Sequence, residues 1–263
     1  DVYKQKLNDC RGALDGLADY SRNNGFVNGS VTSGWESYTL SKDRGVGLSV
    51  DRMDDEETLG MAFGTLAGEF IRTKIVPETD ALRFAEYSKN AADGMKKAED
   101  IDTSAKAVAA IDLGVEKLDD AEVPYEGRIL FVSPGMYRLL KGGITRYTMN
   151  GENDIDYNVE MYDSMRVITV PSGRFNTVCT LAQPEAHDGA GGYTAAGSTI
   201  NFMIVHPSAI MQATRFAEPR IFSPDLVQEA QAWMYDFRQY HGAWVKHQKA
   251  NGIYVSAASF PSA

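Results

Sequence analysis

Hydrophobic residues recur at helical spacing in several stretches of the chain. In the longest stretch, Asp54 and Glu57 form a capping box, and the pattern predicts a helix that ends near Pro77. The apolar positions of this helix are Leu59, Phe63, Leu66 and Phe70. Shorter helices are predicted over 78–92, around Val108–Leu118, from Pro134 to Leu140 and from Pro207 to Gln212.

Alternating or continuously apolar runs predict strands around these helices. They are Trp35–Leu40, Val46–Val50, Ile129–Val132, Met165–Val170, Ile200–Val205, a long strand from Trp233, and Ile253–Val255. The first two runs form either a hairpin or one long bent strand whose partner lies nearer the N-terminus. Asn251-Gly252 predicts a tight hairpin turn before the last strand. Helical and strand patterns together predict an α+β fold class.

Three polar segments interrupt these patterns. Residues 8–34 are rich in turn formers, 148–158 are polar, and 182–199 contain a glycine-rich run predicted to be mobile. Residues 1–51 contain little from which to build a core of their own. We therefore predict that this first segment projects and packs on something else.

The predicted long helix carries a stripe of glycines, Gly60, Gly64 and Gly68. Each costs about 1 kcal/mol relative to alanine in a helix, so a compensating interaction is expected. One interpretation is close approach by another backbone. The other is a helix that tolerates its glycines because tertiary packing holds it. The charged residues that follow, such as Glu69 and Arg72, exclude a membrane dimerisation motif.

Charge and composition exclude several classes of function. The chain has 26 Lys and Arg against 36 Asp and Glu, a net charge of −10. This balance argues against a protein that wraps nucleic acid, because such binding needs Lys and Arg to neutralise phosphates. No apolar run approaches the ~20 residues of a membrane helix, so no membrane partner is expected. Cys10 and Cys179 have no partner motif and are predicted to be free thiols in a reducing compartment.

Catalytic motifs are not found. No phosphate-binding loop, dinucleotide fingerprint or G-x-S-x-G elbow occurs. The four histidines have no metal-ligand spacing, and neither cysteine belongs to a C-x-x-C pair. The acidic run from Asp51 to Glu57 is typical of a helix start, and the aromatic series from Trp233 to Trp244 is typical of a buried sheet face. We predict no enzyme, and no catalytic, cofactor-binding or metal-binding residue.

Several segments, in their order along the chain, resemble a known family. They are Asp43–Asp54, Gly68–Ala81, Leu130–Pro134 with Tyr137, Asn201–Ala209, Pro219–Phe222, Tyr240-His241 and Asn251–Tyr254. These segments are similar to the major capsid proteins of tailed bacteriophages, particularly those of phages that infect Gram-positive bacteria. The same fold also builds encapsulin compartments. The resemblance covers about residues 15–256, and residues 1–14 do not match the strand that the family usually has there.

The resemblance implies the tailed-phage capsid fold (Hong-Kong-97-like). Its extended loop would lie within residues 1–51. The spine helix and the helices of the peripheral domain would occupy 52–124, the axial domain 125–220, and the long peripheral strands with the C-terminus 221–263. The tip of the axial domain would include 182–199 or, alternatively, 148–158.

The implied function is a structural shell subunit of a phage head. Copies of the chain would form pentamers and hexamers of an icosahedral capsid that packages double-stranded DNA without reading its sequence. A scaffolding protein or portal would take part in assembly in the bacterial host cytoplasm, and the product would be a virion component. The candidate subunit contacts are Trp35, Tyr38, Arg44, Gly60, Gly64 and Gly68.

Two other functions remain as alternatives. An encapsulin-type nanocompartment shell shares the fold but needs a groove for a cargo peptide. A soluble α+β enzyme belongs to a different class and is supported only by four histidines and by aromatic residues that could line a pocket. Some relatives cross-link a lysine to an asparagine of the next subunit, and Lys42 and Asn251 are of these types. No acidic partner for that reaction is identified, so no cross-link is predicted.

Overall fold

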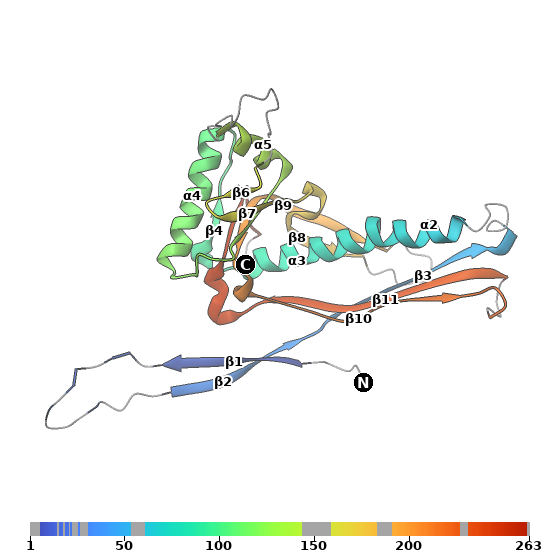
Figure 1. Ribbon diagram of the computed structural model, residues 1–263, viewed down its shortest axis with the longest axis horizontal. Helices are drawn as coiled ribbons and strands as arrows, with labels where there is room; N and C mark the ends of the chain where they lie inside the picture. The colour runs from blue at the N-terminus through green and yellow to red at the C-terminus, as the bar shows by residue number, and fades with distance from the viewer. Residues whose placement is uncertain are drawn as a thin grey trace, which may run out of the picture.

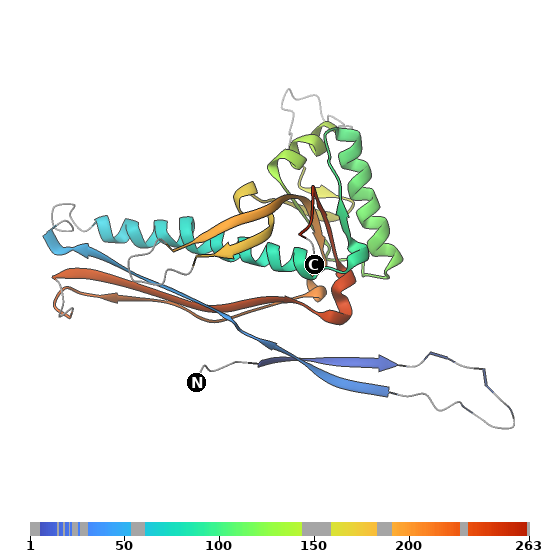
Figure 2. The same cartoon turned by 180° about the vertical axis from the view of Figure 1, so that it is seen from behind.

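The computed structural model has an elongated body and a two-stranded arm that leaves the body at one side (Figures 1 and 2). The described residues are 6–14, 16–17, 19–20, 22, 26, 31–53, 61–143, 159–182, 191–226 and 231–261. The predicted capping box of Asp54 and Glu57, Gly60 and the polar stretch 148–158 lie outside the described residues.

Two sheets form the body. The larger has the strand order β4-β12-β9-β5-β7-β6, with β8 paired to the first part of β9. Its strands are β4 (Lys96–Ala98), β5 (Ile129–Val132), β6 (Met161–Tyr162), β7 (Met165–Thr169), β8 (Asn176–Leu181), β9 (Tyr193–Val205) and β12 (Ile253–Ala257). The smaller has the order β10-β11-β3 and is antiparallel throughout. Its strands are β3 (Lys42–Asp51), β10 (Ile210–Phe222) and β11 (Ala232–Val245).

The helices lie along and across these sheets. They are α2 (Met61–Phe70), a π-helical turn (Ile71–Ile75), α3 (Val76–Asn90), α4 (Ser104–Asp120) and α5 (Pro134–Gly143), with short 3₁₀ turns at Asp93–Met95, Ser172–Arg174, Pro207–Ala209 and His247–Gly252. The first three follow one another without a break and run beside β3 and β11 as one rod, which we call the spine (Figure 1). No helix in the described ranges is long and apolar enough to cross a membrane.

The prediction that the long helix ends near Pro77 is wrong. The helix continues through Pro77 to Asn90, and the turn just before the proline is π-helical. The Val76 N–H bonds to the carbonyl of Ile71, five residues back. A proline inside an α-helix clashes with the carbonyl four residues earlier, and the wider π turn moves that carbonyl away. The spine therefore accommodates Pro77 by changing its helical register.

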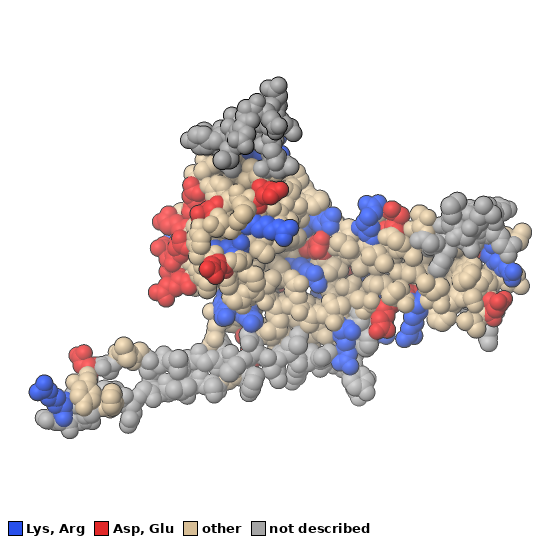
Figure 3. All heavy atoms as spheres, in the orientation of Figure 1, with Lys and Arg blue, Asp and Glu red and all other residues tan. Residues whose placement is uncertain are grey.

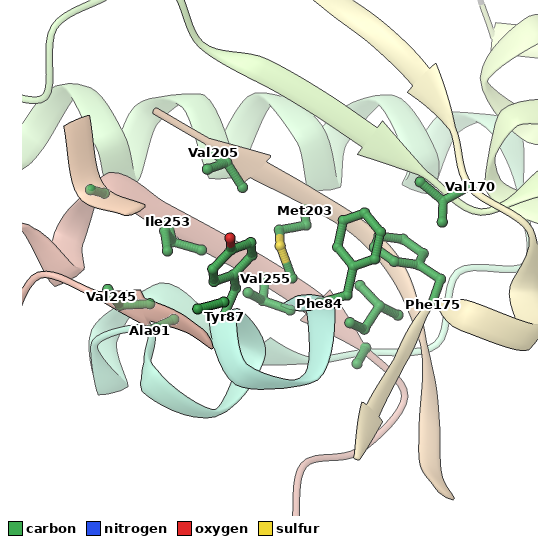
Figure 4. Packing of buried hydrophobic residues seen from close by; sticks show 14 residues of the cluster. Phe84, Tyr87, Ala91, Val170, Phe175, Met203, Val205, Val245, Ile253 and Val255 are labelled. Atoms are coloured by element: carbon green, nitrogen blue, oxygen red, sulfur yellow. The ribbon is translucent and has the colours of Figure 1, made fainter. Parts of the chain in front are cut away.

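The strands of the larger sheet alternate their side chains between two cores. Met203 and Val205 of β9 point to one side, where Phe84 and Tyr87 of α3 cover them (Figure 4). Phe202 and Ile204 point to the other side, where they pack against residues of α4 and α5, such as Ile111. The sheet thus lies between the spine on one face and α4 with α5 on the other.

The two strand runs before the spine do not form a hairpin with each other. The first belongs to β2 (Val31–Thr39), which pairs antiparallel with β1 (Lys6–Leu14), and the second belongs to β3 in the body. The alternative of one long strand holds only in part, because the two runs are separate strands and only the first has its partner nearer the N-terminus. The turn-rich excursion is shorter than 8–34, because β1 and β2 occupy both of its ends.

Three further predictions fail where tertiary pairing overrides local signals. The segment 182–199 is a strand from Tyr193 onward, because β9 pairs with β8 there. The helix from Pro207 is a single 3₁₀ turn, because Ile210 begins the long pairing of β10 with β11. The turn at Asn251-Gly252 does not make a hairpin, because a 3₁₀ helix leads instead into β12 of the larger sheet.

The four segments predicted as domains do not each belong to a single sheet of the structure. The boundary at 220 falls inside β10, which pairs with β11. Helix α4, counted with the peripheral helices in 52–124, packs on the larger sheet. Strand β12 lies in the C-terminal segment but joins β9 and β4. The domain boundaries therefore do not coincide with sheet membership.

Two helical glycines provide a matched test of this packing. A Cβ on Gly114 of α4 would lie 2.9 Å from the Tyr254 ring and 3.1 Å from Ile204, whereas a Cβ on Gly68 would meet nothing within 4 Å. We expect Gly114→Ala to destabilise the fold by about 1–2 kcal/mol, because overpacking outweighs the gain in helix propensity. Gly68→Ala should stabilise it by up to about 1 kcal/mol. Urea unfolding measures both, and a stabilised Gly114→Ala variant would contradict this packing.

Candidate functional site

The arm formed by β1 and β2 extends away from both sheets (Figures 1 and 2). Within the described part of the chain, β1 pairs only with β2, in a register that places Lys6 opposite Thr39 and Leu14 opposite Val31. The end of the arm carries apolar side chains that are largely exposed: Leu17, Phe26, at 86%, and Tyr20, whose ring meets that of Phe26 edge-on at 5.1 Å. These described side chains at the end of the arm therefore bury little apolar surface.

The root of the arm, in contrast, is firmly packed. Tyr38 and Leu40 are buried, and the Tyr38 ring contacts that of Trp244 at a centroid distance of 5.7 Å. The Tyr240 hydroxyl donates a 2.7 Å hydrogen bond to the carbonyl of Leu40. Gly242 leaves room for the Trp244 ring, since a Cβ there would lie 2.5 Å from it. These contacts fix the direction in which the arm leaves the body.

Arg44 links three segments that are far apart in the sequence. Its Nε donates to Glu78 Oε1 of the spine at 2.7 Å, and its Nη2 lies 3.3 Å from Oε2. Its Nη1 donates to the carbonyl of Ala182 at 2.6 Å, and its Nη2 to that of Gly192 at 3.1 Å. Arg44 thus holds β3, the spine and the two ends of the segment between β8 and β9 together.

This arrangement changes how Arg44 and its neighbours are interpreted. The side chain of Arg44, predicted as a subunit contact, is occupied by partners within its own chain. Sequence reasoning missed Glu78, which it treated as an acid in the first turn of a helix. Within the segment 182–199 that was proposed for the axial tip, Ala182 and Gly192 both accept hydrogen bonds from Arg44, beside the spine. No short-range pattern predicts contacts that span 34 and 138 residues.

For the other residues predicted as subunit contacts, the structure describes the position in the fold but not every surrounding contact. Trp35 lies on β2 opposite Cys10, so its backbone belongs to the arm. Gly64 lies within α2. Gly68 is exposed, and no described residue outside its own helix comes within 4 Å of the position that its Cβ would occupy. The subunit-contact roles of all six residues stay predictions.

The spine offers a further exposed surface at its π turn. No residue of Ile71–Ile75 is buried, and Ile71 and Val76 are each about 40% exposed. Arg72 pairs with Glu69 at 2.7 Å on this surface, where both side chains are mostly in water. A helical turn with no supporting core in its own chain is a surface available to a neighbour.

A buried histidine lies near the Arg44 cluster. His241 of β11 is opposite Lys42, is 2% exposed, and its Nδ1 has no hydrogen-bond partner among the described residues. Burial, the largest cause, acts together with the positive charges of Arg83, Lys42 and Arg44 to lower the pKa of His241 to about 4, although the carboxylate of Glu78 acts in the opposite direction. His241 is therefore neutral at pH 7.

Acidic side chains are concentrated along α4 and its flanks, on the side of the larger sheet away from the spine (Figure 3). The exposed carboxylates there are Asp100, Asp102, Asp112, Glu116, Asp119, Asp120, Glu122 and Glu126. A cavity of about 560 Å³ lies between α4 and the segment around β4, and charged side chains such as Lys97, Asp100 and Glu116 line it. Among the described residues, no group of three or more His, Cys, Asp or Glu could hold a metal ion.

Cys179 lies on β8, where the charges of Glu78 and Arg44 act on it, and its thiol is free. Burial, the largest cause, and the nearby carboxylate of Glu78 together raise the pKa of the Cys179 thiol to about 11. A thiol that stays protonated is a poor nucleophile.

Arg44→Ala should destabilise the subunit by about 2–3 kcal/mol, because it leaves the half-buried carboxylate of Glu78 and two carbonyls without their charged donor. Arg72→Ala, which removes an exposed pair on the same spine, should change stability by less than about 0.5 kcal/mol. Urea unfolding of both variants checks this. Equal effects would show that the Arg44 contacts do not hold the body together.

Stability should also fall as the pH is lowered from about 6.5 towards 4. The unfolded chain binds a proton at His241 near pH 6.5, whereas the folded chain does so only near pH 4. Because the unfolded state binds more protons in this window, acid favours unfolding. His241→Gln should remove this contribution, so the difference between wild type and variant should change between pH 7 and 4. A constant difference across that range would refute a buried neutral His241.

Comparison with known proteins identifies the fold. No protein-family model matches the chain, and no curated protein matches it either. Among solved structures, a chain of Mycobacterium phage Che8 matches with a TM-score of 0.66 at 13% identity, over 97% of this chain and 85% of that one. The capsid structure of cyanophage P-SCSP1u gives 0.66 at 11% identity, over 99% and 85%.

A virus-like particle from Pyrococcus furiosus is also similar, with a TM-score of 0.54 at 11% identity, over 96% of this chain and 86% of that one. Identities this low show the fold alone. The predicted α+β class and the predicted architecture are both confirmed: the chain has the Hong-Kong-97-like fold of tailed-phage capsid proteins.

Proposed function

We propose that the chain is a structural shell subunit of a phage head that self-assembles into an icosahedral capsid. The observation that carries this proposal is the arm: its root is fixed by packing, while its apolar end meets no core of its own chain. Such an arm gains burial only by contacting another molecule. In a shell built from many copies of one chain, that molecule is the neighbouring copy.

The elements correspond to the parts of the capsid fold. The arm is the extended loop, the rod of α2, the π turn and α3 is the spine helix, and the sheet of β3, β11 and β10 belongs to the peripheral domain. The larger sheet with α4 and α5 is the axial domain, although α4, β4 and β12 come from outside the predicted 125–220. Because Ala182 and Gly192, at the two ends of the segment between β8 and β9, both bond to Arg44 beside the spine, we favour 148–158 for the axial tip.

The proposed partners follow from this role. Copies of the chain form pentamers and hexamers, a scaffolding protein or portal takes part in assembly in the host cytoplasm, and the shell encloses double-stranded DNA. A net charge of −10 suits a container that does not bind DNA tightly. Similarity to capsids and to a virus-like particle supports the shell role.

The candidate contacts take two different roles in this proposal. Tyr38 and Arg44 position the arm through contacts within the subunit. Trp35, by its place on the arm, and Gly60, Gly64 and Gly68, by their place on the spine, are proposed to face a neighbour. Replacing Tyr38 or Arg44 would therefore disturb the subunit itself and would not isolate an assembly defect.

An encapsulin-type compartment is the second candidate, and the likeness to the virus-like particle of Pyrococcus furiosus favours keeping it. The two differ in contents, since a phage head holds DNA and a compartment holds cargo protein. A soluble enzyme is the third candidate, and two features fail to favour it: the described residues contain no group of three or more His, Cys, Asp or Glu that could hold a metal ion, and the raised pKa of Cys179 keeps its thiol protonated.

The arm end provides the sharpest test of the proposed function. Leu17→Asp with Phe26→Asp should leave the subunit as stable as wild type, because both side chains are exposed. The fraction of protein that assembles into particles should fall by more than about tenfold, because burying the arm end against a neighbouring copy would then bury the two introduced carboxylates. Light scattering coupled to size exclusion, with negative-stain imaging, measures the assembled fraction.

Leu17→Met with Phe26→Leu is the matched control, because it keeps the arm end apolar and should assemble normally. Normal particles from the aspartate variant would contradict a role for the arm end. A wild-type chain that stays monomeric under all assembly conditions would contradict the proposed function itself.

A further inference from the structure

The face of the smaller sheet that lies against the spine contains a buried histidine. On this face, Ala243 of β11 packs in one core with Tyr87 of α3, and the Tyr235 ring meets that of Phe70 edge-on at 6.3 Å. Side chains alternate between the two faces of a strand, so His241, two residues before Ala243, points to the same side. His241 is therefore enclosed between β11 and the spine.

Positively charged side chains approach His241 from both neighbouring elements. On β3, Lys42 is its direct cross-strand neighbour, so the two Cβ atoms lie about 5 Å apart. Arg44 follows two residues later on the same face, where it bonds to Glu78 of the spine. On α3, Arg83 lies close enough for its charge to act on His241. Three positive charges thus act on the imidazole, against the negative charge of Glu78.

Two of these cations are not balanced within the described part of the chain. Arg44 pairs with Glu78, whereas neither Lys42 nor Arg83 forms an ion pair with a described residue. Both of these side chains are half-buried. Charges that are withdrawn from water are normally paired, because their desolvation costs free energy. A negative charge that no described residue supplies is therefore expected beside them.

Two hydrogen-bonding nitrogens in the same place are also unused. The Nδ1 of His241 and the Nε of Arg83 are both buried, and neither has a partner among the described residues. His241 as a whole is 2% exposed. Nearly all buried polar atoms of native proteins have a hydrogen-bond partner, which can be protein, water or an ion. Because one of these two nitrogens belongs to a cation, a partner that accepts hydrogen bonds and carries negative charge suits them best.

We propose that a small inorganic anion binds between His241 of β11, Arg83 of α3 and Lys42 of β3. The anion accepts hydrogen bonds from the two unused nitrogens and balances the two unpaired cations. Chloride and inorganic phosphate share this chemistry. Lys42 begins β3 two residues after Leu40, so the bound anion ties the root of the arm to the spine. All three residues belong to one subunit, so this inference does not depend on the proposed shell function.

Thermal unfolding of the full chain as a free subunit tests the site. When 200 mM chloride replaces gluconate at constant ionic strength, the Tm should rise by at least about 4 °C, because a ligand of the folded state stabilises it. Phosphate at the same ionic strength is the second arm, and the larger rise identifies the preferred anion. Arg83→Met should abolish the dependence. Arg72→Met, which removes an exposed arginine of the same spine, should keep it.

Two results of this experiment would overturn the inference. One is a Tm that responds to neither anion, and the other is an equal response in wild type and Arg83→Met. Bromide, a chloride analogue that is visible by anomalous X-ray scattering, locates the ion directly. A crystal of the chain soaked in bromide should show an anomalous peak between His241 and Arg83. Density there without an anomalous peak in bromide, and without a tetrahedral shape in phosphate, would show that the two nitrogens hold water.

Discussion

The fixed root of the arm is the constraint on which the rest of this account depends. A hydrogen bond from Tyr240 to the Leu40 carbonyl and the packing of Tyr38 on Trp244 set the direction of two strands that have no core of their own. Hydrophobic burial contributes roughly 25 cal/mol for each Å² removed from water, and the exposed Leu17 and Phe26 obtain almost none of it within the chain. The isolated subunit is thus folded but leaves apolar side chains at the end of its arm exposed to water.

Arg44 connects this arm to the remainder of the body. Arg44 lies four residues after Leu40. Its guanidinium donates hydrogen bonds to Glu78 of the spine and to the carbonyls of Ala182 and Gly192. A displacement of β3 therefore acts on the spine and on the segment between β8 and β9 at the same time. Arg44 therefore holds β3, the strand from which the arm leads, to the spine and to the segment between β8 and β9.

Local sequence patterns predicted the parts of the fold that local forces decide. The apolar spacing from Val108 to Leu118 gave helix α4, and the alternation after Trp233 gave β11. Long-range pairing decided what the patterns missed: the sequence around Ile210 became a strand only because β11 lies beside it. The Arg44–Glu78 pair likewise could not be predicted from the sequence, because a single arginine and an acid at the start of a helix each have many possible partners. The family resemblance supplied the architecture that periodicity alone could not.

The most direct test of the central claim is a cryo-electron microscopy reconstruction of particles assembled from the purified chain, at a resolution that traces the backbone. The account predicts that residues 6–39 leave each body at Leu40 and lie on a neighbouring copy of the chain. An arm that folds back on its own body, or that projects from closed particles without touching a neighbour, would contradict it.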